Sequence, residues 1–231
     1  HKGAIDLVTD VDRAAEDLIA ERLRAAFPDH QLVGEEGARG ATGTSNASAY
    51  RWVIDPLDGT TNYAHGYPHF AVSIGLEYAG TPLLGAIYDP LLDELFVAGA
   101  GRGATLNGRR LAVSDTRALI DSLLATGFPY DLERRGRSNA LWEAFNERSQ
   151  GVRRAGSAAL SLCYVAAGRL DGYWERPIRP WDMAAGALIV VEAGGQISRL
   201  AGEPFAIDGG EIVASNRLLH PAILEIIGER T

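Results

Sequence analysis

The sequence predicts a layered α+β fold in which two sheets and their helices meet at a cleft. Segments that favour strands dominate residues 1–113, and strands alternate with helices over residues 114–231. We therefore expect an α+β domain over the first range and an α/β domain over the second, with the functional site where they meet. A chain of 231 residues, 46% hydrophobic, can bury a core without a metal or disulfide to hold it.

The composition excludes several classes of protein. There are 30 acidic and 22 basic residues, a net charge of −8, so we expect no direct nucleic-acid partner. No apolar run approaches the roughly 20 residues of a membrane-spanning helix, so no membrane partner is expected. The single cysteine, Cys163, excludes an internal disulfide and fits a cytoplasmic location.

The first half is expected to begin with an amphipathic helix over 10–27. Its apolar residues recur at helical spacing, Thr9 or Asp10 can cap it, and Pro28 follows its end. Short strands are predicted over 31–34, 51–54, 71–78, 83–89 and 94–100. The segment 37–50 is rich in small and polar residues and predicts a loop, and Asn107-Gly108 predicts a hairpin turn.

The second half alternates between the two kinds of element. Strands are predicted over 122–128, 171–175 and 211–215. Helices are predicted over 138–149, 157–167, 181–193 and 217–229. The glycine-rich stretch 99–103 has no helix after it, which disfavours a dinucleotide site.

Two aspartates follow the buried strand 51–54 directly, in the sequence DPLDGTT. Pro56 and Gly59 favour a turn, which would hold Asp55 and Asp58 close together. Two carboxylates at close range repel each other, and a divalent metal ion removes that repulsion. A hard cation such as Mg²⁺ prefers oxygen ligands of this kind, so the motif predicts a metal site.

The same turn offers backbone groups as well as side chains. The turn exposes the carbonyl of Leu57, an oxygen of the kind that Mg²⁺ prefers, and the N–H groups over 59–61 suit an anion at a helix N-terminus. An Asx-type turn that only caps the next helix explains the motif equally well when it is taken alone.

Acidic residues also occur at two other places. Glu35-Glu36 ends the strand 31–34, where a solvated pair is the simpler interpretation, and Asp182 stands in the first turn of an apolar helix, where capping is the simpler one.

Three motifs follow one another in the chain: GEE at 34–36, WVIDPLDGTTNY at 52–63 and PWDMAAGALIVVEAGG at 180–195. With GSAALSLCYVAAGRLDGYWE at 156–175, they resemble the inositol monophosphatase family of Mg²⁺-dependent, lithium-sensitive phosphatases. The resemblance covers essentially the whole chain. It implies alternating α-β-α-β-α layers, as in inositol monophosphatase and fructose 1,6-bisphosphatase, and it places the family's usual first helix before residue 1.

The resemblance implies ligands for two or three Mg²⁺ ions. Glu35, Asp55 and the Leu57 carbonyl would bind the first ion, and Asp55, Asp58 and Asp182 the second. A third ion would share Glu35 and be held mostly by water.

The resemblance also implies hydrolysis by in-line attack of a metal-activated water, with no phosphoenzyme. Thr60 would orient this water with support from Asp12, and Glu35 would complete the catalytic set. The backbone N–H groups of Gly59 and Thr60 would hold phosphate oxygens.

Substrate hydroxyls would meet Asp58, the backbone of Gly156, Ser157 and Ala158, and Glu175. A carboxylate such as that of Glu175 can accept hydrogen bonds from two neighbouring hydroxyls of a polyol.

Several residues have possible or simpler roles. Lys2 matches a lysine that the family places before DLVT, or else belongs to a frayed terminus, and Glu36 is a nearby acid without an assigned role. The histidines His65 and His69 are expected to be loop or packing residues. The basic run Arg134, Arg135 and Arg137 is expected to form a solvated loop.

The leading hypothesis is a phosphomonoesterase that hydrolyses myo-inositol monophosphate, because TTNY after DPLDG resembles the inositol branch. Thr61 stands where histidinol-phosphate and nucleotide-phosphate relatives more often carry a lysine. Activity on histidinol phosphate or fructose 1,6-bisphosphate, and a regulatory binding role on the same fold, are the alternatives. A small phosphorylated polyol and a second copy of the chain are the expected partners.

Overall fold

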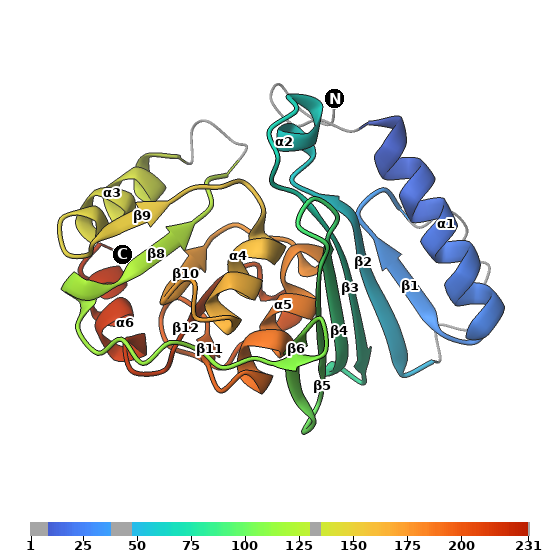
Figure 1. The fold of residues 1–231 in the computed structure, drawn as a ribbon. Coiled ribbons are helices and arrows are strands. Elements are labelled where there is room, and N and C mark those ends of the chain that lie inside the picture. Colours follow the sequence, from blue (N-terminus) through green and yellow to red (C-terminus); the bar gives the residue numbers. More distant parts are fainter. Residues whose placement is uncertain (1–8, 38–47, 130–134, 231) are drawn as a thin grey trace.

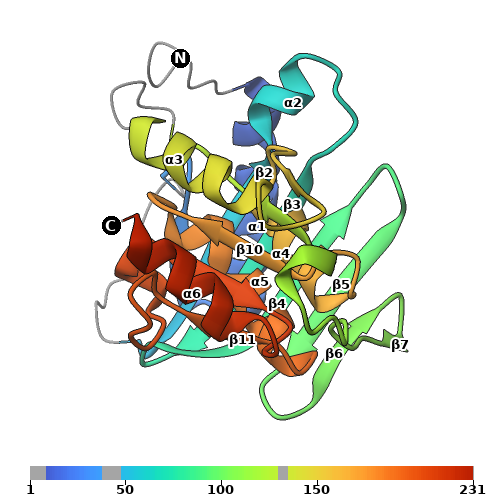
Figure 2. The same ribbon diagram turned by 90° about the vertical axis from the view of Figure 1, so that its left-hand side faces the viewer.

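Helices and sheets alternate in five layers across the protein (Figure 1). The structure is a computed structural model, which describes residues 9–37, 48–129 and 135–230. Helix α1 (Asp10–Ala26) covers the outer face of the first sheet, and α4 (Ala158–Ala166) and α5 (Pro180–Glu192) lie between the two sheets. Helices α3 (Arg135–Asn146) and α6 (His220–Glu229) lie in front of the second sheet in Figure 2. The predicted α-β-α-β-α arrangement is therefore confirmed.

The first sheet has seven strands in chain order, with β1 parallel to β2 and every other neighbouring pair antiparallel. Its strands are β1 (Gln31–Gly34), β2 (Tyr50–Asp58), β3 (Ala71–Tyr78), β4 (Thr81–Asp89), β5 (Glu94–Gly99), β6 (Gly103–Leu106) and β7 (Arg109–Arg110). The predicted hairpin turn joins β6 to β7, where Asn107 and Gly108 have φ of 47° and 78°. Two successive positive φ angles are typical of the turns that Asn-Gly favours.

The second sheet has five strands in the order β11-β12-β10-β8-β9. They are β8 (Leu123–Thr126), β9 (Gly151–Arg153), β10 (Gly172–Glu175), β11 (Gln196–Ser198) and β12 (Ile212–Ser215). Strands β9 and β11 were not predicted, because three residues are too few to show the alternation that identifies a strand.

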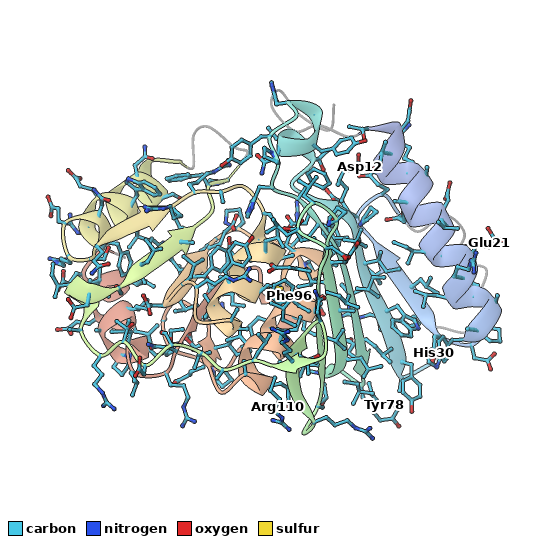
Figure 3. All side chains as sticks on the ribbon, viewed as in Figure 1. Asp12, Glu21, His30, Tyr78, Phe96 and Arg110 are labelled. Atoms are coloured by element: carbon cyan, nitrogen blue, oxygen red, sulfur yellow. The ribbon has the colours of Figure 1, made fainter. Side chains whose placement is uncertain are left out.

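Helix α5 is buried between the layers, which explains why its sequence is apolar on all sides. The helix approaches both neighbours closely. A Cβ atom added to Gly85 of β4 would lie 2.7 Å from the Ala185 carbonyl oxygen, and one added to Gly186 would lie 2.6 Å from Leu162 Cδ1 of α4. Figure 3 shows Phe96 of β5 in this central region. Glycine at these contacts lets the central helices pack tightly against each other and against the sheet.

The structure corrects several predicted boundaries. Strand β2 does not end at Ile54 but continues to Asp58. Helix α3 begins at Arg135, so the expected solvated loop is wrong for Arg135 and Arg137, whereas Arg134 lies outside the described residues. Most of the predicted loop 37–50 also lies outside them. The division into domains at residues 113 and 114 stays a prediction. Among the described residues, no helix is long and apolar enough to cross a membrane.

Candidate active site

Three aspartates from the two halves of the chain converge between the first sheet and α5. Each of Asp55, Asp58 and Asp182 offers a carboxylate oxygen within 4.8 Å of those of the other two. Asp55 and Asp58 lie on β2 with 1% and 7% of their surface exposed, and Asp182 is half-buried in the first turn of α5. The predicted convergence of these acids is therefore observed in the fold.

A bulge in β2 brings its two aspartates together. In a regular strand, residues three positions apart point to opposite faces. Opposite Asp55 and Asp58 on β3 stand Ser73 and Ala71, which are only two positions apart, so β2 carries one extra residue here. Pro56 is tolerated at this irregular position because a bulge leaves a residue outside the hydrogen-bonded ladder.

The three carboxylates are held close together and form no ion pair with a basic side chain among the described residues. Burial raises the pKa of Asp55 and of Asp182 well above the usual range, and the neighbouring acids raise both further. Burial also raises the pKa of Asp58 to about 6, although hydrogen bonds from Ser157 and the α4 backbone oppose the shift. None of the three takes part in an ion pair within the described ranges. Three converging carboxylates, two of them buried and all without a positive partner among the described residues, fit a hard divalent cation.

The N-terminus of α4 holds Asp58 in place. One carboxylate oxygen, Oδ2, accepts hydrogen bonds from Ser157 Oγ at 2.5 Å and from the Ala159 N–H at 2.7 Å. The other, Oδ1, accepts a longer one of 3.4 Å from the Ala158 N–H. A carboxylate at a helix N-terminus is stabilised by the unpaired N–H groups and by the helix dipole. The backbone of Ser157 and Ala158 therefore orients Asp58 as well as lining the cavity described below.

The predicted pairing of Thr60 with Asp12 is present. Thr60 opens the short helix α2 (Thr60–Ala64), and its Oγ1 lies 3.0 Å from Asp12 Oδ1 and 3.1 Å from the Leu57 carbonyl oxygen. Asp12 is fully buried, and its Oδ2 accepts hydrogen bonds from both the N–H and the hydroxyl of Thr9. Figure 3 shows Asp12 near the start of α1 on the side that faces the sheet.

Glu35 and Leu57 lie beside the cluster, whereas Glu36 faces elsewhere. Glu35 follows β1, its N–H donates to the Ile54 carbonyl, and its charge raises the pKa of all three clustered aspartates. Glu35 is nevertheless not one of the three residues whose oxygens converge. The Glu36 N–H donates to Glu16 Oε2 at 2.9 Å, and Glu36 lines a separate cavity. Lys2 lies outside the described residues.

A cavity opens beside Asp58 and Asp182 on the side of the second sheet. Its other lining residues are Thr126, Gly127, Phe128, Arg154, Gly156, Ser157, Ala158, Ser161, Tyr173 and Glu175. The substrate-side residues predicted from the sequence, Gly156 to Ala158 and Glu175, thus share one cavity with two of the acids.

The carboxylate of Glu175 is positioned by two neighbours. It accepts a hydrogen bond from the buried hydroxyl of Tyr173. A Cβ atom at Gly127 would overlap it, so only glycine there leaves room for the carboxylate. Burial raises the pKa of Glu175 to about 7, while Tyr173 and Arg154 lower it and Asp58 raises it.

Asn62 is a positioning residue that the sequence analysis missed. Its Nδ2 donates to the carbonyl oxygens of His69 at 2.7 Å and Ala155 at 2.8 Å. The next residue, Gly156, has φ of 91°, and a Cβ there would lie 3.0 Å from the Asn62 amide. Asn62 therefore joins the segment after β2 to the segment before α4. The motif TTNY contains this residue, but a single asparagine in a helix as short as α2 carries no periodic signal.

Other residues singled out from the sequence lie outside the acidic cluster. His65 caps the C-terminal end of α2, and the His69 ring lies 6.0 Å from that of Tyr164. The glycine-rich stretch 99–103 is a turn whose Gly101 and Gly103 N–H groups donate to Glu192 of α5. The Glu192 carboxylate thus occupies two backbone N–H groups of this turn.

The five layers, with an acidic cluster that could hold a metal ion between them, define a class of layered α+β proteins. The chain belongs to the inositol monophosphatase family, whose sequence profile matches residues 1–231.

Proteins similar to this chain carry two names, Nus factor SuhB and inositol-1-monophosphatase. The chain is 48% identical to Nus factor SuhB of Pseudomonas aeruginosa, over 98% of this chain and 84% of that one. It is 47% identical to an inositol-1-monophosphatase of a Synechocystis species, over 96% of this chain and 77% of that one. Among solved structures, inositol monophosphatase from Anabaena aligns with a TM-score of 0.89 and 46% identity, over 97% of this chain and 88% of that one.

Proposed function

We propose that this protein is a Mg²⁺-dependent phosphomonoesterase that hydrolyses myo-inositol monophosphate to inositol and phosphate. The observation that supports this most directly is the converging group Asp55, Asp58 and Asp182, two of which line a cavity that also contains the carboxylate of Glu175. Relatives named inositol-1-monophosphatase support the substrate.

The donor set fits Mg²⁺. Asp55, Asp58 and Asp182 would hold the metal, with Glu35 and the Leu57 carbonyl as additional ligands. When bound, Mg²⁺ would supply the positive charge that lets an acidic cavity accept a phosphate and would activate water for attack.

The protein's own residues orient the attacking water. Thr60 Oγ1 carries one proton, and both oxygens within its reach, on Asp12 and Leu57, can only accept it. Its lone pairs are therefore left to accept a proton from a water, and the buried Asp12 fixes that orientation. The backbone N–H groups of Gly59 and Thr60 would hold the phosphate oxygens.

The substrate hydroxyls would lie towards the second sheet. Asp58 and Glu175 would accept hydrogen bonds from them, and the segment Gly156 to Ala158 would line one side. Asn62, through its hydrogen bond to the Ala155 carbonyl, would hold the segment Gly156 to Ala158 in place beside the phosphate site.

Phosphate release from a panel of substrates tests the proposal. Inositol 1-phosphate, histidinol phosphate and fructose 1,6-bisphosphate are offered with Mg²⁺ and with EDTA. Mg²⁺-dependent release with the highest kcat/KM on inositol 1-phosphate is expected. Preference for either other substrate would replace the inositol assignment, and no release from any of them would overturn the phosphatase assignment.

A second candidate is a regulatory binding role, which the name Nus factor SuhB on relatives in Pseudomonas aeruginosa and Escherichia coli favours. An Asp58→Asn variant separates the two, because it removes a metal ligand without changing the outer surface. A cellular function that persists in the inactive variant would support binding. A homodimer in the cytoplasm is also proposed, and sedimentation velocity tests the dimer.

A further inference from the structure

One charged residue of the cavity has no role in the function proposed above. Arg154 follows β9 directly and lines the cavity together with Asp58, Glu175 and Asp182. It is the one cation among the described residues that line the cavity, and its side chain is exposed.

Among the described residues, none pairs with the Arg154 guanidinium. Within the described part of the chain, Arg154 takes part in no ion pair or hydrogen bond, whereas most cavity residues around it do. Its positive charge still reaches Glu175, whose pKa it lowers. A guanidinium has five N–H donors, and here they are free for a ligand.

We propose that Arg154 is a specificity-determining residue that donates hydrogen bonds to the hydroxyl oxygens of a polyol substrate, beside Glu175, which accepts from them. A hydroxyl group is both donor and acceptor, so a carboxylate and a guanidinium on one wall match two neighbouring hydroxyls. The inference rests on the proposed phosphatase function and deepens it.

The surroundings favour a neutral hydroxyl over a second phosphate at this place. A second phosphate beside Arg154 would also face the carboxylates of Glu175 and Asp58, and like charges at close range repel each other. Phe128 adds an apolar surface to the same cavity and suits the C–H groups of a polyol ring better than an anion.

The neighbouring arginine provides a matched control. Arg153 ends β9, is exposed, and does not line the cavity. Its Nη1 lies 3.1 Å from the position of a Cβ on Gly151, so its side chain folds back over its own strand. Replacing Arg153 removes the same charge from the neighbouring position without removing a cavity donor.

The experiment measures kcat and KM of Arg154→Gln and Arg153→Gln with three substrates: inositol 1-phosphate, phenyl phosphate and fructose 1,6-bisphosphate. Phenyl phosphate has a leaving group without hydroxyls. In Arg154→Gln, KM for inositol 1-phosphate should rise about tenfold, the size of one charge-assisted hydrogen bond, with kcat and the phenyl phosphate KM unchanged. Arg153→Gln should resemble the wild type.

Three results would overturn the inference. An equal rise in KM for inositol 1-phosphate and phenyl phosphate would place Arg154 on the scissile phosphate. A rise confined to the bisphosphate would place it on a second phosphate, and no rise would show that it binds no part of the substrate. A wild-type protein that releases no phosphate from any substrate would instead overturn the proposed function.

Discussion

The hydroxyl of Thr60 lies 3.0 Å from Asp12 Oδ1 and joins α2 to the first turn of α1 across 48 positions of the chain. The partner cannot move, because Asp12 is fully buried and Thr9 holds its other oxygen. The cap of α1, on the outer face of the first sheet, thus determines the orientation of the Thr60 hydroxyl.

Replacing Thr60 by Val should impair turnover and spare binding. Valine keeps the shape but removes the proton that Asp12 accepts and the lone pairs that would orient water. We expect kcat to fall about 100-fold with KM nearly unchanged, as for other groups that position a reactant. Thr60→Ser, which retains the hydroxyl, should restore most of the activity; an equally inactive serine variant would contradict this role.

Asp58→Asn should abolish turnover while the fold persists. The amide keeps the size of the side chain but removes the negative charge that a metal ion needs, so kcat should fall by at least about 100-fold. Circular dichroism and thermal unfolding should show a folded protein. Asp115→Asn, which changes an exposed acid, is the control; near-normal turnover in Asp58→Asn would reject the metal site.

Mg²⁺ should stabilise the fold independently of substrate. The metal would bind the converged carboxylates only in the folded state, so at 100 times its dissociation constant it should add about 2.7 kcal/mol to the free energy of unfolding. Thermal unfolding with MgCl₂ and with NaCl of equal ionic strength measures this. The increase should disappear in Asp55→Asn, and equal melting temperatures in the two salts would contradict Mg²⁺ binding.

The carboxyl of Glu175 should make stability depend on pH. Burial raises its pKa from 4.5 to about 7, so the folded protein retains a proton that the unfolded chain releases. The contribution is present below pH 4.5 and is lost as pH rises to about 7. Urea unfolding in EDTA across this window should show a steeper fall for the wild type than for Glu175→Gln. Parallel curves would show that Glu175 titrates normally.

Gly127→Ala should weaken substrate binding without weakening the fold. The added Cβ would overlap the Glu175 carboxylate. The Glu175 side chain is flexible, so it would make room by moving its carboxylate away from its present position. We expect KM for inositol 1-phosphate to rise about tenfold, as in Glu175→Gln, with little change in melting temperature. Gly136→Ala is the control because nothing lies within 4 Å of the added atom; unchanged KM in Gly127→Ala would show that Glu175 need not be fixed.

The sequence predicted the elements whose patterns are long and regular. Helix α1 has apolar residues at helical spacing and a Thr9 cap, and both the helix and the cap are present. The end of β2 was predicted too early, because Asp55, Pro56 and Asp58 disfavour strands locally. The bulge and the pairing with β3 override that preference.

The site was predicted in part. Asp55 and Asp58 could be identified from the chemistry of one turn, whereas the approach of Asp182 and the pairing of Thr60 with Asp12 came from family resemblance. No periodicity connects residues so far apart, since only the packing of α5 and α1 on the first sheet brings them together. Asn62 and Arg154 were missed because only the tertiary structure shows that the first joins two distant segments and that the second lines the cavity.

The central position of α5 has a consequence for the order of events when the chain is synthesised. Asp182 lies 124 residues after Asp58, so a nascent chain can complete the entire first sheet before the third carboxylate has left the ribosome. Until α5 inserts between the sheets, the two aspartates of β2 lack this third ligand. Acquisition of the metal would therefore report that α5 has packed against the first sheet.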